Sequence, residues 1–190
     1  MTNEPAAAGG PLAAGAFSLR HPTEDDQPAI VGMIDEWFGG QRVRHLVGRA
    51  WFRHFGSTSW LAEDAGGAAV GFLIGYRSPD RPGEAVIHLI AVHPNHRRRG
   101  IGRALIETFV RDGADRGVAS ISALAWPGEP PAIAFFRALA FLPDDGPGSR
   151  NLFGTTAFPD YDGPGEDRVV FVRRSLERFA VDPDQRRLSD

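Results

Sequence analysis

The stretch His88-Leu-Ile-Ala-Val-His-Pro-Asn-His-Arg-Arg-Arg-Gly-Ile-Gly-Arg103 decides the fold. Its first part is rich in aliphatic residues and predicts a strand, whereas Ile101, Leu105 and Phe109 recur at helical spacing. The turn between the two parts holds three arginines and two glycines. Free backbone amides and the positive end of the helix dipole meet at a helix N-terminus, and glycines leave them accessible. This junction therefore predicts a site for a pyrophosphate.

The rest of the chain predicts strands and helices around this junction. Strands are expected at 17–20, 59–62, 68–76, 85–92, 121–126 and 168–173. Helices are expected after Thr23, over 43–55, over 100–117 and over 132–139, the last ending at the proline-rich segment 143–148. The strands on either side of the turn at 64–67 form a predicted hairpin, and the elements from 85 to 126 form a predicted parallel βαβ unit.

Composition limits the class of protein. A chain of 190 residues with 42% hydrophobic residues favours one core, expected at 17–176 between a disordered tail at 1–16 and a tail or short helix at 177–190. A net charge of -3 gives no general attraction to nucleic acid or to a membrane, so neither is an expected partner. The chain has no cysteine, and we expect no metal. Because neither a basic leader nor a long apolar run is seen, the expected location is cytoplasmic.

The junction and its surroundings resemble the GNAT superfamily of N-acetyltransferases over about residues 17–176. The turn that begins Val92-His93-Pro94, the run 97–102 and the helix after it match that family's acetyl-CoA motif position by position. The resemblance implies an α/β (α+β) fold in one domain. Its central sheet would be mixed, mostly antiparallel and twisted, with about six or seven strands, about four flanking helices and splayed strands that form the acetyl-CoA cleft.

The resemblance also implies acetyl-CoA as cosubstrate. Backbone N–H groups of residues 98–103 would hold the pyrophosphate, and residues 90–92 would bond to the pantetheine arm as an added strand would. The helix at 132–141 resembles the family's later helix with two departures: Phe136 stands where a tyrosine often protonates the leaving thiolate, and Glu129 where an asparagine commonly contacts the cofactor. The expected cofactor-binding residues are Ile90, Ala91, Val92, Arg97, Arg98, Arg99, Gly100, Ile101, Gly102, Arg103, Glu129 and Phe136.

Attack on a thioester needs a neutral amine, and alkyl ammonium groups, with a pKa of about 10.4, must first lose a proton. We expect His88 to accept it, because histidine suits proton transfer near neutral pH and this one precedes the acetyl-binding segment by two residues. The corresponding strand of arylalkylamine N-acetyltransferases is similar and has a histidine in the proton path. Alternation predicts His88 on one face with Ile90 and Val92. Glu84, of the same parity, is the alternative base or a relay through water; either residue could instead have only structural or solvent partners.

Family resemblance implies that the acceptor lies between the first two helices and the last hairpin. The expected acceptor-binding residues are Trp37, Phe38, Arg42 and Asp160, and Tyr161 is the candidate substitute for the missing acid. Core packing is the alternative for the two aromatic residues, because exposed Trp and Phe are uncommon.

The predicted function is N-acetyl transfer from acetyl-CoA to a primary amine of a small molecule, peptide or protein by direct attack in a ternary complex. A non-catalytic acetyl-CoA-binding regulatory or protein-interaction module is the alternative, favoured by the phenylalanine at position 136. Nucleic-acid binding through the arginines ranks last, because the chain shows no wider basic face. A homodimer is left open.

Overall fold

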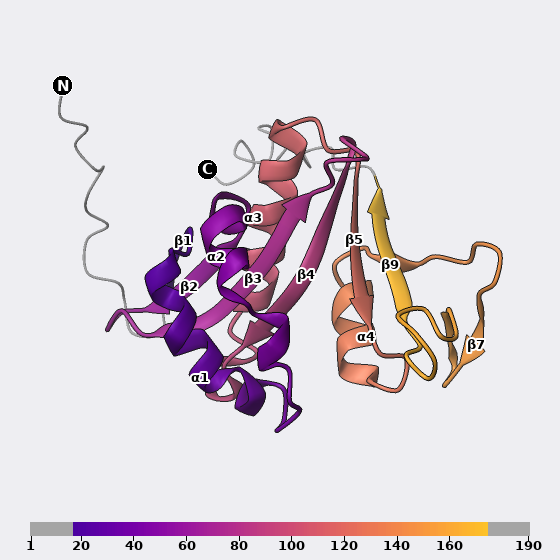
Figure 1. Ribbon diagram of the computed structural model, residues 1–190, viewed down its shortest axis with the longest axis horizontal. Helices are drawn as coiled ribbons and strands as arrows, with labels where there is room; N and C mark the ends of the chain where they lie inside the picture. Colours follow the sequence, from indigo (N-terminus) through magenta and orange to yellow (C-terminus); the bar gives the residue numbers. More distant parts are fainter. Residues whose placement is uncertain (1–16, 175–190) are drawn as a thin grey trace, which may run out of the picture.

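The structure is a computed structural model that describes residues 17–174, so the predicted tails at 1–16 and 177–190 lie outside the described residues. Its main sheet has seven strands in the order β1-β2-β3-β4-β5-β9-β6 (Figure 1). Every neighbouring pair is antiparallel except β4 and β5, which run parallel. The strands are β1 Phe17–Arg20, β2 Trp60–Asp64, β3 Ala69–Arg77, β4 Glu84–Val92, β5 Ser120–Ala125, β6 Leu142–Pro143 and β9 Val169–Arg174.

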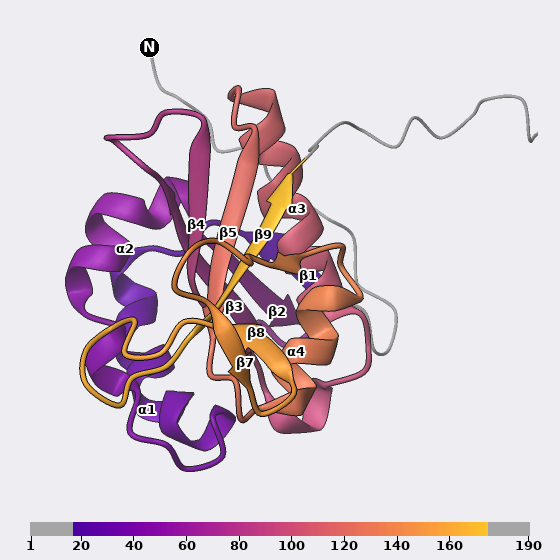
Figure 2. The ribbon, with the colours of Figure 1, turned by 90° about the vertical axis from the view of Figure 1, so that its right-hand side faces the viewer.

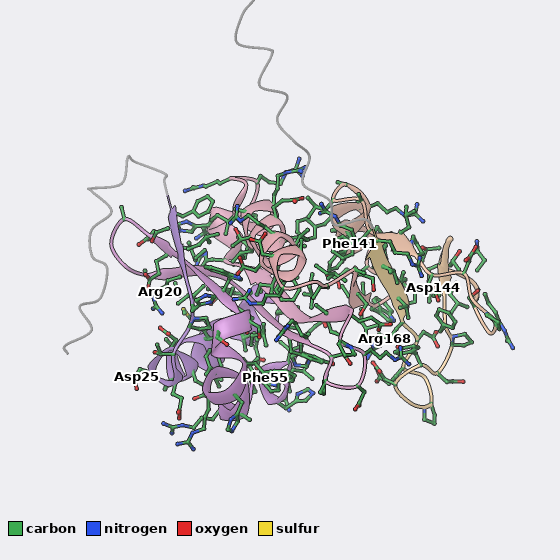
Figure 3. All side chains as sticks on the ribbon, turned by 90° about the horizontal axis from the view of Figure 1, so that it is seen from above. Arg20, Asp25, Phe55, Phe141, Asp144 and Arg168 are labelled. Carbon is green, nitrogen blue, oxygen red and sulfur yellow. The ribbon has the colours of Figure 1, made fainter. Side chains whose placement is uncertain are left out.

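Helices cover both faces of the sheet. Figure 2 shows α1 (Gln27–Trp37) and α2 (Arg49–Phe55) on one face and α3 (Ile101–Asp115) and α4 (Pro130–Arg137) on the other. Each pair closes a hydrophobic core against the sheet, and Figure 3 shows Phe55 and Phe141 on opposite sides of it. Four short 3-10 turns complete the connections: η1 Glu24–Asp26, η2 Arg44–Leu46, η3 Gly56–Thr58 and η4 Pro94–His96.

Two glycines of β3 let α3 lie close to the sheet. A Cβ atom at Gly71 would stand 2.9 Å from a methyl group of Ile101, and one at Gly75 would stand 2.5 Å from the ring of Phe109. Both partners are buried residues of the apolar face of α3. The small residues of β3 therefore fix how the start of α3 sits beside the end of β4.

The expected fold class is confirmed: a mixed, mostly antiparallel sheet with four flanking helices. The hairpin of β2 and β3 and the parallel unit of β4, α3 and β5 are also confirmed. The segment expected to be one helix over 43–55 is instead the turn η2 followed by α2, because Gly48 interrupts it with an extended backbone. The strand β6 and the hairpin of β7 (Arg150–Leu152) and β8 (Thr155–Ala157) were not expected. Within the described residues, no helix is both long enough and apolar enough to traverse a bilayer.

Candidate active site

Strands β4 and β5 run side by side only at their beginnings. Residues 84–87 pair with 120–123, and Ile87 with Ala123 is the last pair. Beyond it, β4 follows β3 as far as Val92, whereas β5 stays paired with β9. Figure 1 shows the two strands diverging toward their carboxyl ends. The edge of β4 that faces this divergence has no strand partner in the part of the chain that the structure describes.

A β-bulge lies at His88, where two consecutive residues of β3 pair with Ile87 and Leu89. An extra residue breaks the alternation of side chains. His88 and Leu89 therefore both lie on the side of α1 and α2, while Ile87 and Ile90 contact the core under α3. The expectation that His88 shares a face with Ile90 and Val92 is wrong for this reason. The bulge directs the imidazole to the α1/α2 side at the point where the strands begin to diverge.

The free edge of β4 offers backbone groups to a ligand. The His93 N–H donates to the Val70 carbonyl of β3 at 2.9 Å. Since alternate residues of a strand direct their N–H and C=O groups to the same side, those of Ile90 and Val92 face the divergence. The Val92 carbonyl accepts a bond from Nε of Arg97 at 3.1 Å. An extended amide-containing chain could therefore bond to Ile90 and to the Val92 N–H as an added strand does.

The loop that follows has a backbone suited to an anion. Arg98 and Gly100 are left-handed, with φ of 62° and 82°. Left-handed residues in a turn bring successive N–H groups into a concave anion site, and arginine adopts this conformation at a cost of about 1–2 kcal/mol. The first helical bond runs from the Ala104 N–H to the Gly100 carbonyl at 2.9 Å. The amides of residues 100–103 thus precede the helical ladder and fit the predicted pyrophosphate site.

The arginines of this loop differ in what they contact. Arg97 donates from Nε to the Val92 carbonyl and from Nη2 to the Trp37 carbonyl, so its side chain joins the end of β4 to the end of α1. All four arginines, Arg97, Arg98, Arg99 and Arg103, are exposed. They add positive charge around the amides without burying it, and Arg97 also holds the loop in place.

The start of α3 and the helix α4 are in direct contact. A Cβ atom at Gly102 would lie 3.1 Å from the ring of Phe135, so the missing side chain lets the two helices meet. Glu129 is the exposed N-cap residue of α4. Phe136 is buried and stacks on Phe171 at 5.2 Å between ring centroids. These contacts give the side chain of Phe136 a place in the core under α4.

His88 is held by two contacts from the α1/α2 side. Its Nε2 lies 2.9 Å from the Leu46 carbonyl, and its ring stacks on Trp51 at 4.0 Å with an interplanar angle of 18°. A carbonyl only accepts, so Nε2 carries the hydrogen. In the neutral ring, Nδ1 then carries the lone pair that can accept a proton.

Glu84 lies far from this point. It begins β4, opposite Ser120, and its carboxylate is 3.4 Å from Arg81. Glu84 lies four positions before His88, or about 13 Å along the strand at the usual rise per residue. It shares the sheet face of His88 but stands at the paired end of β4 and β5, which is too far for a relay through one water.

The structure divides the expected acceptor residues into two groups. Trp37, the last residue of α1, is only 3% exposed and packs against Phe72 and His93. Phe38 is half-buried against the same core, whereas Arg42 is exposed between α1 and η2. Of this set, Arg42 has the most freedom to meet a ligand from solvent.

The loop 158–168 carries the other expected residues. Figure 2 shows it on the same side of the sheet as α1 and α2. The Asp160 carboxylate accepts the Gly165 N–H at 2.6 Å, and Arg168, labelled in Figure 3, bonds to Asp162 and Glu166 at 2.7 Å each. Tyr161 is exposed. The loop is therefore braced by its own ion pairs, and Tyr161 is an exposed residue on it.

Four neighbours of the site were not expected. Leu46 and Trp51 hold the imidazole, and Leu124 and Trp126 are exposed at the end of β5. The exposure of Leu124 and Trp126 had a signal in the sequence. These two large apolar residues lie at i and i+2, on the opposite face of the strand from Ile121, Ala123 and Ala125. The contact of Leu46 had none, since a backbone carbonyl can come from any residue. In the described part of the chain, no group of three His, Asp or Glu side chains is arranged to hold a metal ion.

A diverging strand pair, a free strand edge and backbone amides at one helix N-terminus form an arrangement that suits a long, phosphorylated, amide-containing ligand. The model of the acetyltransferase (GNAT) family matches residues 23–141, more than half of the chain. The chain belongs to this family.

Similar proteins agree with this assignment. An L-2,4-diaminobutyric acid acetyltransferase of Nocardia farcinica is 37% identical over 114 residues, which are 60% of this chain and 58% of that protein. The chain therefore spans less than two thirds of that relative's length. The crystal structure of Ard1 from Thermoplasma volcanium superposes with a TM-score of 0.69 at 20% identity over 85% of this chain and 99% of that one. A Paenibacillus lautus diaminobutyrate acetyltransferase, solved with L-2,4-diaminobutyric acid and coenzyme A, gives 0.61 at 21% identity over 85% and 96%. These two likenesses show the fold.

Proposed function

We propose that this protein transfers the acetyl group of acetyl-CoA to a primary amine. The observation that carries the proposal is the continuity between the free edge of β4 and the amides at the start of α3. A pyrophosphate on the amides of residues 100–103 would leave its pantetheine arm to follow Ile90 and Val92 toward the bulge. The thioester would then lie near His88, at the start of the divergence.

His88 is the proposed base. The neutral amine attacks the thioester carbonyl carbon, the C–N bond forms, the C–S bond breaks, and the amine loses a proton. Nδ1 of His88 can take that proton, because Nε2–H is held by the Leu46 carbonyl and keeps the ring in one tautomer. A free N–H on the β4 edge can stabilise the oxygen that gains charge during the attack.

The leaving thiolate needs a proton from another group. Phe136 carries no exchangeable proton and is buried. We assign this role to Tyr161, an exposed residue of the loop that shares the α1/α2 side with His88. Arg42 and Asp160 are the proposed contacts to the acceptor from that side. A primary amine as acceptor is supported by the diaminobutyrate acetyltransferases to which the chain is similar.

Release of the CoA thiol tests the proposal. Acetyl-CoA is supplied with a panel of amines that includes L-2,4-diaminobutyrate, and the wild type is compared with His88→Ala, Glu84→Ala and the matched control His54→Ala, an exposed histidine of α2. We expect His88→Ala to lower kcat by about 100-fold or more, with the other two within about threefold of the wild type. Full activity of His88→Ala would remove the base. Binding of acetyl-CoA without turnover of any amine would instead favour a non-catalytic module.

A further inference from the structure

The end of β5 exposes large apolar side chains beside the proposed base. Leu124 is 40% exposed and Trp126 is 49% exposed, although most side chains of this size in the described chain are buried. Ile87 and Ala123 form the last register pair of β4 and β5, and both belong to the core under α3. The next residues, His88 and Leu124, therefore both lie on the opposite face, one step beyond the last pair.

Phe153 extends this surface from the β7–β8 hairpin. Its ring lies 5.8 Å from that of Trp126, and it is 72% exposed. Phe153 and Gly154 form the two central positions of the hairpin turn, with φ of 52° and 81°. Both signs are positive, as in a type I′ turn, which favours asparagine, aspartate or glycine and strains a phenylalanine. The chain thus holds an aromatic ring in solvent at a cost in stability, which is typical of a residue retained for contact with a ligand.

Charge on the same side favours a cation. The loop 158–168 holds four carboxylates and one guanidinium, and its Arg168 is already paired with Asp162 and Glu166. An ammonium group is attracted to such a loop, whereas a carboxylate is repelled by its net negative charge. Arg42, the cationic member of the proposed acceptor contacts, lies outside this loop, between α1 and η2. Gly128 makes room for the Trp126 ring, since a Cβ there would stand 2.5 Å from it.

We infer that Leu124, Trp126 and Phe153 form an apolar acceptor surface and that the preferred acceptor is a primary amine on an aromatic or bulky aliphatic body without a carboxylate. This inference rests on the proposed function. It names the class of amine: the ammonium group enters toward the acidic loop and His88, and the apolar body covers the three side chains. A small polar amino acid would leave them exposed.

Four amines that combine two properties test the inference. Phenethylamine and phenylalanine both have an aromatic body, and only phenylalanine carries a carboxylate. Diaminopropane and L-2,4-diaminobutyrate both have a small polar body, and only L-2,4-diaminobutyrate carries a carboxylate. We expect kcat/KM to be about tenfold higher for phenethylamine than for each of the other three. Trp126→Ala should raise the KM for phenethylamine about tenfold and leave the KM for acetyl-CoA within about twofold.

Two further variants separate a local contact from a general loss of structure. Leu142→Ala removes a leucine that is exposed on the same sheet face but two strands away. This variant should leave the KM for phenethylamine and the KM for acetyl-CoA unchanged. Phe153→Asn relieves the turn, so it should raise the thermal midpoint while it raises the KM for phenethylamine severalfold. Stability and binding then move in opposite directions, which simple damage to the hairpin cannot produce.

Three outcomes of the kinetic and sedimentation experiments overturn the inference. The first is a preference for L-2,4-diaminobutyrate that Trp126→Ala leaves intact. The second is a rise in the KM for acetyl-CoA alone in Trp126→Ala, which would mean that the tryptophan contacts the cofactor. The third is a dimer in sedimentation that dissociates in Trp126→Ala, which would make the surface an interface between copies.

If no amine is acetylated, the proposed function fails. Calorimetry of phenethylamine with the CoA-loaded protein then decides the inference. Binding that Trp126→Ala abolishes supports the inference, and absence of binding refutes it.

Discussion

Replacing Gly100 by alanine separates the role of the loop amides from the stability of the fold. Gly100 is left-handed with φ of 82°, and a Cβ atom there would meet nothing within 4 Å. Alanine in this conformation costs about 1–2 kcal/mol, partly offset because alanine has less freedom than glycine in the unfolded chain. We expect a net loss of about 1 kcal/mol, or about 2–4 °C in thermal midpoint for a chain of this length.

Gly117 provides the matched control. It lies just after α3, has φ of 78°, and a Cβ atom there would also meet nothing within 4 Å. Gly117→Ala should therefore cost the same stability. Only Gly100→Ala adds a methyl group beside the amides that open α3, so we expect it alone to weaken acetyl-CoA binding, by about tenfold.

Calorimetric titration with acetyl-CoA and urea denaturation of the three proteins are the assays. Equal losses of stability with unequal losses of affinity would support the reasoning. Wild-type affinity in Gly100→Ala would refute it, and so would an equal loss of affinity in both variants, since strain alone would then account for the effect.

Three other substitutions test the description of the fold. Ala140 closes α4 in a left-handed conformation with φ of 62°, so Ala140→Gly should raise the free energy of unfolding by about 0.5–1 kcal/mol in urea titrations; a loss would contradict the strain. Phe136→Tyr would bury a hydroxyl, so it should cost about 1–3 kcal/mol, and wild-type stability would mean that the ring edge reaches the cleft. Hydrogen bonding from Arg20 lowers the pKa of Asp26, so its contribution is present above the unfolded value of about 3.9 and is lost as pH falls through the lower folded value. Asp26→Asn should thus cost about 1–2 kcal/mol at neutral pH and flatten the acid limb of a pH–stability profile, and parallel wild-type and variant profiles would argue against this.

The elements around the phosphate loop could be predicted because several signals agree there. The aliphatic run before Val92, the glycines and the apolar stripe of α3 all specify strand, turn and helix at the same boundaries. The hairpin of β7 and β8 could not be predicted, because three-residue strands are too short to show alternation and its turn contains Phe153 in place of a usual turn residue.

The site was less accessible to sequence reasoning than the fold. Most of the residues expected to hold acetyl-CoA lie in one stretch, 90–103, so one motif predicts them together. The sheet face on which His88 lies depends on a bulge, and no residue type predicts that bulge. The exposure of Leu124 depends on the divergence of two strands. Trp37 and Phe38 are of residue types that also line binding surfaces, yet Trp37 at the end of α1 is buried in a core and Phe38 after it is half-buried against the same core. Such outcomes follow from tertiary packing, and the parity of Leu124 and Trp126 at the end of β5 is the one local sign of them noted above.

The central claim is that the backbone amides of residues 100–103 hold the pyrophosphate of acetyl-CoA. Titration of the ¹⁵N-labelled protein with acetyl-CoA, followed by amide chemical shifts and hydrogen exchange, tests it at each residue. The account predicts that the amides of Gly100, Ile101, Gly102 and Arg103 shift and become protected, together with those of Ile90 and Val92. Saturation by acetyl-CoA that leaves these six amides unshifted and unprotected, while others respond, would contradict it.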